Sequence, residues 1–304
     1  MASKVNPRTI KAIERQKQKT KRPVSQSKKG TKIQGQAPRS ERPQLIAFIS
    51  VVVVLIVILA IVLISITTGG NSSTKTVQNS SVPVAGKLLS ELTQIPASVY
   101  NQVQVSSNST QPPQKISGPL LTSDGKPEVL YIGAEFCPYC AAERWILITA
   151  LSRFGTFSGL KTWYSSSSDT PASIPTFTFL NASYSSKYIT FVTKENEDEN
   201  HNLLQPVTSQ EQALWTKYSN GQLGYPFVDI ANRFTTGAQY EPTLLSGLNQ
   251  NTIARDINNP TSQVGQAIIT GANYIDAAIC SVLKNGPASV CNSPAVKAAT
   301  SKLG

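Results

Sequence analysis

The order of hydrophobic and polar residues divides the chain into four parts. Residues 1–43 have no apolar periodicity and are rich in Gln, Lys, Pro and Ser, which predicts a disordered tail. An apolar run follows from Leu45 to Ile66, in which only Ser50 and Ser65 are polar. Residues 67–114 are dominated by Ser, Thr, Asn, Gln and Val, which predicts a flexible stalk. Strand and helix periodicities then alternate, so we predict one folded domain over residues 115–304.

The apolar run is long enough to cross a membrane. Its 22 residues would span a hydrocarbon core of about 30 Å at about 1.5 Å per residue. The alternative is a cleaved signal peptide, which we reject because the run is too long and no A-x-A site follows it. We therefore predict a transmembrane helix over residues 44–66.

The net charge of +11 lies entirely in the tail. Residues 1–43 hold 13 basic and 2 acidic side chains, whereas the charges of the remaining residues balance. This distribution argues against nucleic-acid binding. Because basic segments stay on the cytoplasmic side, we predict a single-pass protein of the cell membrane with a cytoplasmic tail and an extracytoplasmic folded domain. Attraction of the tail to anionic lipid is a secondary interpretation.

Two features stand out in and near the predicted stalk. A short helical segment, Gly86 to Val105, is interrupted by Pro96. Glycosylation sequons begin at Asn71, Asn79, Asn108 and Asn181, three of them in the stalk, which is compatible with an exposed linker.

The folded domain is predicted to be an α/β structure. The predicted strands are 128–132, 160–165, 176–179, 188–192, 225–230 and 233–236, and the predicted helices are 137–154, 208–218, 243–257 and 262–283. We expect strand 160–165 to lie parallel to strand 128–132 after a crossover. We expect strands 176–179 and 188–192 to form a hairpin, followed by a charged loop over residues 194–202.

The most informative stretch is Cys137-Pro138-Tyr139-Cys140, at the junction between a predicted strand and a predicted helix. Unpaired backbone N–H groups and the helix dipole at that junction favour a thiolate over a thiol. Pro138 loses no hydrogen bond in the first helical turn. A thiolate at Cys137 can attack a disulfide, and Cys140, one turn later, can resolve the mixed disulfide. The spacing therefore predicts a reversible dithiol, with Cys137 as nucleophile and Cys140 as resolving thiol.

The segment Ala134 to Cys140 resembles the active-site segment of thioredoxin-fold proteins, and its Pro-Tyr dipeptide is like that of glutaredoxins. The longer run from Ile132 to Leu151 is similar to a prokaryotic, largely archaeal family of membrane-anchored thioredoxin-like proteins catalogued as a domain of unknown function. The resemblance implies a thioredoxin-like fold in the order β-α-β-α-β-β-α, here with an inserted hairpin and an extra C-terminal helix. It implies no substrate.

The same resemblance implies a cis-proline beside the dithiol, with two candidates, Pro175 and Pro226. We favour a cis Tyr225–Pro226 bond, because a helix must precede the cis-proline strand and only Pro226 has one before it. Tyr225 and Pro226 would then help to bind substrate. The buried carboxylate of thioredoxins is not matched, since Tyr131 takes its place. We expect Glu135 near the surface and His201, the only histidine, in a solvated loop.

Cys280 and Cys291 form a second pair. Outside the membrane an unpaired thiol rarely persists, so we predict a structural disulfide that stabilises the C-terminal segment. Two alternatives are a relay pair that exchanges with Cys137 and Cys140, and a zinc site formed by all four cysteines.

We therefore predict a membrane-anchored, extracytoplasmic thiol–disulfide oxidoreductase that acts on protein thiols or disulfides and needs no cofactor or metal. The alternative is a non-catalytic, thioredoxin-like cell-surface module for binding or structure, in which the bridge between Cys137 and Cys140 is only a structural disulfide.

Overall fold

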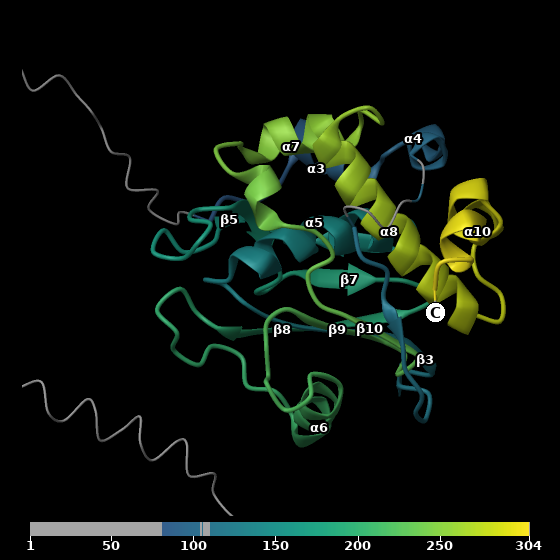
Figure 1. Cartoon of the computed structure of the whole chain (residues 1–304), viewed down its shortest axis with the longest axis horizontal. Coiled ribbons are helices and arrows are strands. Elements are labelled where there is room, and N and C mark those ends of the chain that lie inside the picture. Colours follow the sequence, from purple (N-terminus) through teal and green to yellow (C-terminus); the bar gives the residue numbers. More distant parts are fainter. Residues whose placement is uncertain (1–80, 104, 106–109, 304) are drawn as a thin grey trace, which may run out of the picture. The chain divides into compact units, whose positions relative to one another are not determined.

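A mixed β-sheet organises the part of the chain that the computed structural model describes, residues 81–103, 105 and 110–303 (Figure 1). The predicted tail and transmembrane helix lie outside these residues, as do the sequons at Asn71, Asn79 and Asn108. Within the described ranges, no helix combines the length and the apolar character that crossing a membrane requires. The domain is mixed α/β, as predicted.

Strand β3 is the centre of the sheet. It pairs in parallel with β8 and antiparallel with β9 and β2, while β9 pairs with β10 and β10 with β1. The strands of this sheet are β1 (Gln114–Lys115), β2 (Thr122–Ser123), β3 (Lys126–Ala134), β8 (Thr190–Glu197), β9 (Phe227–Ile230) and β10 (Phe234–Thr236). The register between β3 and β8 shifts between Gly133 and Ala134, at the end of β3 that leads to the dithiol.

Helices cover both faces of the sheet (Figure 1). The helices α5 (Pro138–Leu151) and α8 (Gln263–Val282) lie on one face, and α6 (Ser209–Tyr218) lies on the other. Side chains alternate along β3 because successive residues of a strand point to opposite faces. Val129 and Tyr131 therefore join the core under α5 and α8, whereas Leu130 and Ile132 pack with Trp215 of α6.

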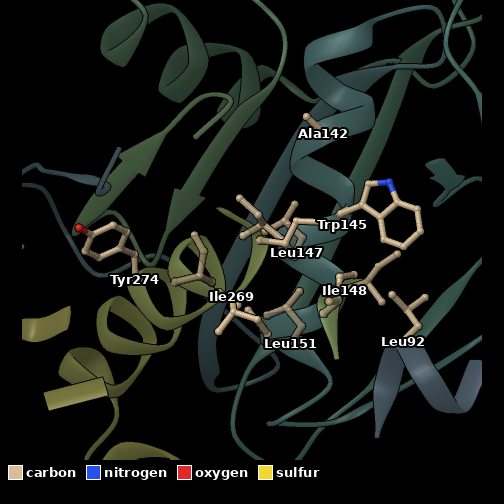
Figure 2. Packing of buried hydrophobic residues seen from close by; sticks show 14 of the residues in the cluster. Leu92, Ala142, Trp145, Leu147, Ile148, Leu151, Ile269 and Tyr274 are labelled. Atoms are coloured by element: carbon tan, nitrogen blue, oxygen red, sulfur yellow. The ribbon is translucent and has the colours of Figure 1, made fainter. Parts of the chain in front are cut away.

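The larger core is built around α5. Figure 2 shows Trp145, Leu147, Ile148 and Leu151 of this helix between Ile269 of α8 and Leu92. All six side chains are fully buried. Gly271 of α8 allows the close approach of the two helices, because a Cβ atom there would lie 2.3 Å from Ile146 of α5. The core thus fixes the helix that begins at the dithiol.

The pairing predicted for three strands is wrong. Strand β5 (Lys161–Tyr164) does not join β3 but pairs antiparallel with β6 (Pro175–Thr178), and the parallel neighbour of β3 is β8. The predicted hairpin therefore does not form, and the predicted charged loop begins late because β8 continues to Glu197. A strand's local pattern shows which face it buries but not its partner, and β8 offers β3 a longer ladder than β5 would. A further pair, β4 (Thr156–Ser158) with β7 (Ser183–Ser185), was not predicted.

The predicted boundary between stalk and folded domain at residue 115 is too late. Pro96 separates two helices, as predicted, but both pack on the domain: α3 (Gly86–Thr93) and α4 (Ala97–Gln102). Leu92 is fully buried and Tyr100 is 2% exposed. Because this region is mostly polar, the few apolar residues that pack it against the core are hard to recognise in the sequence.

The chain ends in more helices than predicted. After the 3-10 helix η1 (Pro242–Leu245), the helices are α7 (Gln250–Ile257), α8, α9 (Ala288–Cys291) and α10 (Pro294–Thr300). Helix α10 was not predicted, although Ser293 caps its N-terminus and Pro294 is its first residue, a usual start signal. In contrast, the predicted start of α6 is confirmed, because Thr208 and Glu211 form a capping box.

Candidate functional site

Cys137 is the N-cap residue of α5. Its sulfur accepts a hydrogen bond from the backbone N–H of Cys140 at 3.2 Å, in place of the oxygen that usually caps a helix. Pro138 occupies the first helical turn, as predicted. The strand-to-helix junction therefore holds the Cys137 sulfur at the positive end of the helix dipole.

The two thiols are electrostatically different. Hydrogen bonding from Cys140 lowers the pKa of Cys137, and Arg144 and the backbone N–H of Tyr139 act in the same direction. Burial raises the pKa of Cys140 well above its ordinary value, and its hydrogen bond to Cys137 adds to this. Both side chains are nearly inaccessible, with Cys137 5% exposed and Cys140 fully buried. Cys137 is thus the thiol that ionises first.

The backbone of Tyr225 closes one side of the dithiol. The Tyr225–Pro226 bond is cis, which confirms that prediction, and the Tyr225 carbonyl oxygen lies 3.9 Å from the Cys137 sulfur. The aromatic ring of Tyr225 packs edge-on against Phe136. Pro175 instead begins β6, where its carbonyl accepts a hydrogen bond from the Trp145 indole. A second cis bond, Thr170–Pro171, was not predicted.

A buried ion pair lies below the dithiol and was not predicted from the sequence. Arg144, one turn after Cys140 on α5, donates two hydrogen bonds to the Glu195 carboxylate, at 3.0 and 2.5 Å. It also donates to the Ala134 carbonyl at 3.0 Å. Arg144 and Glu195 are fully buried. The available signal was that Arg144 and Glu143 are the two charged residues of a mostly apolar helix. Glu195 gave no separate signal, because it lies in the charged run at the end of β8.

The prediction for Glu135 is wrong. It was expected near the surface, but only 3% of the residue is exposed. Its carboxylate lies 3.8 Å from Arg144 and accepts a short hydrogen bond from the Thr178 hydroxyl. Burial, with the nearby Glu195 carboxylate, raises the pKa of Glu135 to about 8. Glu135 directly follows β3, whose ladder with β8 shifts register between Gly133 and Ala134, and local sequence does not reveal this pairing.

Tyr131 occupies the position at which a carboxylate was sought, and it is fully buried. The Arg144 guanidinium lies 5.9 Å from its ring centroid. Gly133, two residues on, leaves room for the phenol, because a Cβ atom there would lie 2.0 Å from the Tyr131 hydroxyl. Strand β3 therefore contributes a tyrosine to the site, and the nearby carboxylates come from Glu135 and from β8.

His201 lies in an exposed loop, as predicted, but it also reaches the rim of the site. Its ring centroid is 3.8 Å from that of Phe136, the residue before Cys137. Its Nδ1 atom lies 3.6 Å from the Glu197 carboxylate, which accepts a hydrogen bond from the Tyr225 hydroxyl at 2.9 Å. The loop therefore borders the dithiol.

The second cysteine pair is bonded. Cys280 and Cys291 form a disulfide between the last turn of α8 and α9, which confirms the predicted bond. The predicted zinc alternative with all four cysteines is therefore not formed. Among the described residues no group of three or more His, Cys, Asp or Glu is placed to hold a metal ion.

Taken together, the described residues define a mixed α/β domain with a buried Cys-Pro-Tyr-Cys dithiol at the start of a central helix. The chain belongs to the family described as a domain of unknown function (DUF929), which matches residues 112–281. No curated protein and no solved structure matches the chain. The matched residues include the dithiol, Glu135, Arg144, Glu195 and Tyr225.

Proposed function

We propose that this protein is a membrane-anchored, extracytoplasmic thiol–disulfide oxidoreductase with a thioredoxin-like fold. One observation carries the proposal: the Cys137 sulfur accepts the Cys140 N–H at the start of α5, while the Cys140 thiol is fully buried. This arrangement favours the thiolate at Cys137 and keeps Cys140 protonated until it is needed. A nucleophile and a resolving thiol require this division of roles.

The order of elements supports the thioredoxin-like assignment. The path β3-α5-β8-α6-β9-β10-α8 follows the order β-α-β-α-β-β-α. The strands β4, β5, β6 and β7 form an insertion between α5 and β8. The insertion therefore precedes the second strand of the core, whereas the sequence had suggested that it follows it.

The reaction is a thiol–disulfide exchange. The Cys137 thiolate attacks one sulfur of a client disulfide, so that a Cys137–client bond forms and the client's own bond breaks. The departing client sulfur takes up a proton. The Cys140 thiol then loses its proton and attacks the Cys137 sulfur, which releases the second client thiol and leaves a Cys137–Cys140 disulfide. The client is reduced by two electrons, and the reverse sequence oxidises a client dithiol.

The location rests on two observations. The apolar run over residues 45–66 suits a membrane anchor, and the basic tail before it suits a cytoplasmic N-terminus. The Cys280–Cys291 disulfide is typical of an oxidising compartment, which supports an extracytoplasmic domain. Protease added to intact cells should therefore remove the folded domain and spare the tail.

A second candidate function is a structural or binding module in which the Cys137–Cys140 bridge is permanent. The low exposure of both residues favours it, because a buried bridge reacts slowly.

The reduction potential of the Cys137–Cys140 couple separates the two functions. We would measure it in defined thiol buffers on the full-length chain carrying Cys280→Ser and Cys291→Ser. With the second pair removed, the measured potential belongs to the Cys137–Cys140 couple. An oxidoreductase should give a potential above about −300 mV, whereas a structural bridge should lie below it. A value below this limit would refute the proposed function.

A further inference from the structure

Two cavities flank Tyr139, the aromatic residue between the two cysteines. Their volumes are about 750 Å³ and about 480 Å³. Gln111, Tyr139 and Ala238 line both, so the cavities are two halves of one depression. We call it the Tyr139 groove. Its larger half lies against the start of α8 and its smaller half against the end of α6.

The groove leads to the reacting sulfur. Tyr225 and Pro226 line the smaller half, and the Tyr225 carbonyl is the group 3.9 Å from the Cys137 sulfur. Tyr139 itself is 39% exposed on a helix whose other residues are almost all buried. A chain bound at Cys137 would therefore run past Tyr139 into both halves.

The walls of the groove are almost free of charge. Among the described residues that line it, Glu241 is the only charged one, and it lies in the larger half. Exposed glutamines are the recurring polar groups on both sides: Gln111, Gln114, Gln222, Gln263 and Gln266. Tyr218, Tyr225 and Phe227 add aromatic surface to the smaller half. Amides both donate and accept hydrogen bonds, so such walls suit a polar but uncharged chain.

We infer that the Tyr139 groove binds an extended client segment on both sides of its reacting cysteine and selects segments without charged side chains. A charged side chain entering the groove would lose water, which costs binding energy. Among the described lining residues, Glu241 in the larger half is the only counter-charge, and it is available only to a positive side chain. A peptide backbone would find hydrogen-bonding amides along its path. This inference rests on the proposed function and adds the class of substrate.

Three peptides test the selection. Each carries one cysteine as a mixed disulfide with thionitrobenzoate, flanked by Gln and Ser, by Glu, or by Lys. The full-length chain in its dithiol form releases the coloured thiol, which gives the second-order rate constant. We expect the neutral peptide to react at least about tenfold faster than both charged peptides, a difference of about 1.4 kcal/mol. Reduction of 2-hydroxyethyl disulfide, too small to fill the groove, reports the dithiol alone.

Charge placed on the groove should change the preference in a defined direction. Gln266→Lys and Gln222→Lys put one positive charge in the larger and the smaller half, respectively. Each should speed the reaction of the Glu peptide several-fold and slow that of the Lys peptide. The matched control is Gln102→Lys, at an exposed glutamine of α4 that lines neither half. It should leave all three rate constants unchanged.

The outcomes separate this inference from the proposed function. If 2-hydroxyethyl disulfide and all peptides are unreactive, the oxidoreductase proposal fails. If 2-hydroxyethyl disulfide reacts but the peptides do not differ, or a charged peptide reacts fastest, the dithiol is active and the groove does not select uncharged segments. An unchanged preference in both groove variants would likewise overturn it.

Discussion

The two cysteine pairs of this domain differ in where each lies on its helix. Cys137 caps the N-terminus of α5, where its sulfur accepts a backbone N–H, whereas Cys280 lies in the last turn of α8. The N-terminal end of a helix stabilises a thiolate and the C-terminal end disfavours it. One pair is left as two thiols and the other is bonded. Position on the helix therefore separates a pair suited to exchange from one suited to stability.

Each pair also has an arginine paired with a buried carboxylate, and one member of that ion pair lies one helical turn away. Arg144 follows Cys140 by four residues and binds Glu195, while Asp276 precedes Cys280 by four residues and binds Arg153. Only the first of these arginines lowers the pKa of a cysteine. The comparison thus offers two similar ion pairs, one beside a dithiol and the other beside a disulfide.

The relay alternative for the second pair is not favoured by this geometry. Gln266 of α8 borders the groove at Tyr139, and Cys280 lies 14 residues further along the same helix. At about 1.5 Å per residue, this places the disulfide about 20 Å along the helix axis from that point. Direct exchange with Cys137 would require a large rearrangement of a helix packed in the core.

Removal of single sulfurs gives the largest expected contrast between the pairs. Cys137→Ser should reduce exchange with 2-hydroxyethyl disulfide to the uncatalysed rate, because the nucleophile is gone. Cys140→Ser should accumulate mixed disulfides with client proteins, because nothing resolves them. The double variant Cys280→Ser/Cys291→Ser should keep the wild-type rate. Non-reducing electrophoresis detects the trapped species, and equal trapping by both single variants of the first pair would contradict the assigned roles.

Substitution of the two arginines should give the next largest effect. Arg144→Gln and Arg153→Gln each leave a buried carboxylate unpaired, so each should lower the free energy of unfolding by about 3–5 kcal/mol. Only Arg144→Gln should raise the pKa of Cys137, because Arg144 favours that thiolate. Thiolate absorbance against pH measures this, with Arg144→Lys as the variant that keeps the charge. An identical Cys137 titration in all three variants would exclude Arg144 from this role.

Loss of the disulfide alone should be a stability effect. The double variant Cys280→Ser/Cys291→Ser should lower the free energy of unfolding by about 2–3 kcal/mol, because the bond closes a short loop in the unfolded chain. Urea unfolding measures the difference, with reduction of the wild type as an independent check. Unchanged stability together with slower exchange would contradict the structural role of this disulfide. That pattern would indicate that the second pair takes part in exchange.

A pH dependence of stability should also differ between the two regions. Burial raises the pKa of Glu135 to about 8 and that of Asp276 to about 7. The folded state then holds more protons than the unfolded state, so stability falls as pH rises toward these values, by at most about 1.4 kcal/mol per pH unit for each group. Below the unfolded pKa of each group the full contribution is present.

Two substitutions test which carboxyl group causes each part of this pH dependence. Glu135→Gln should flatten the fall in stability up to about pH 8, whereas Asp276→Asn should flatten it only up to about pH 7. Unfolding in urea at a series of pH values measures both. Because Asp276 lies far along α8 from the dithiol, its variant should leave the exchange rate unchanged. A pH dependence that is the same in Glu135→Gln as in the wild type would show that Glu135 is already ionised in the folded state across this window.

The local features of the site were largely predicted from the sequence. A strand, a Cys-Pro-x-Cys spacing and a helix are local features, so they predicted β3, the start of α5 and the position of Cys137. The choice of Pro226 over Pro175 also followed from the order of elements, and the cis bond confirms it. The disulfide partners were the only two cysteines left.

The tertiary structure decided what depends on neighbours distant in sequence. Strand pairing placed β8 beside β3, where a local pattern had suggested β5, and the folded chain buries Glu135. That same pairing brought Glu195 to Arg144 and so placed an ion pair under the dithiol. Hydrophobic periodicity specifies which face of an element is buried, but partners and registers are selected by the packing of the whole core. The sequence alone therefore predicted which thiol lies at the start of the helix, and only the fold determined the charges around it.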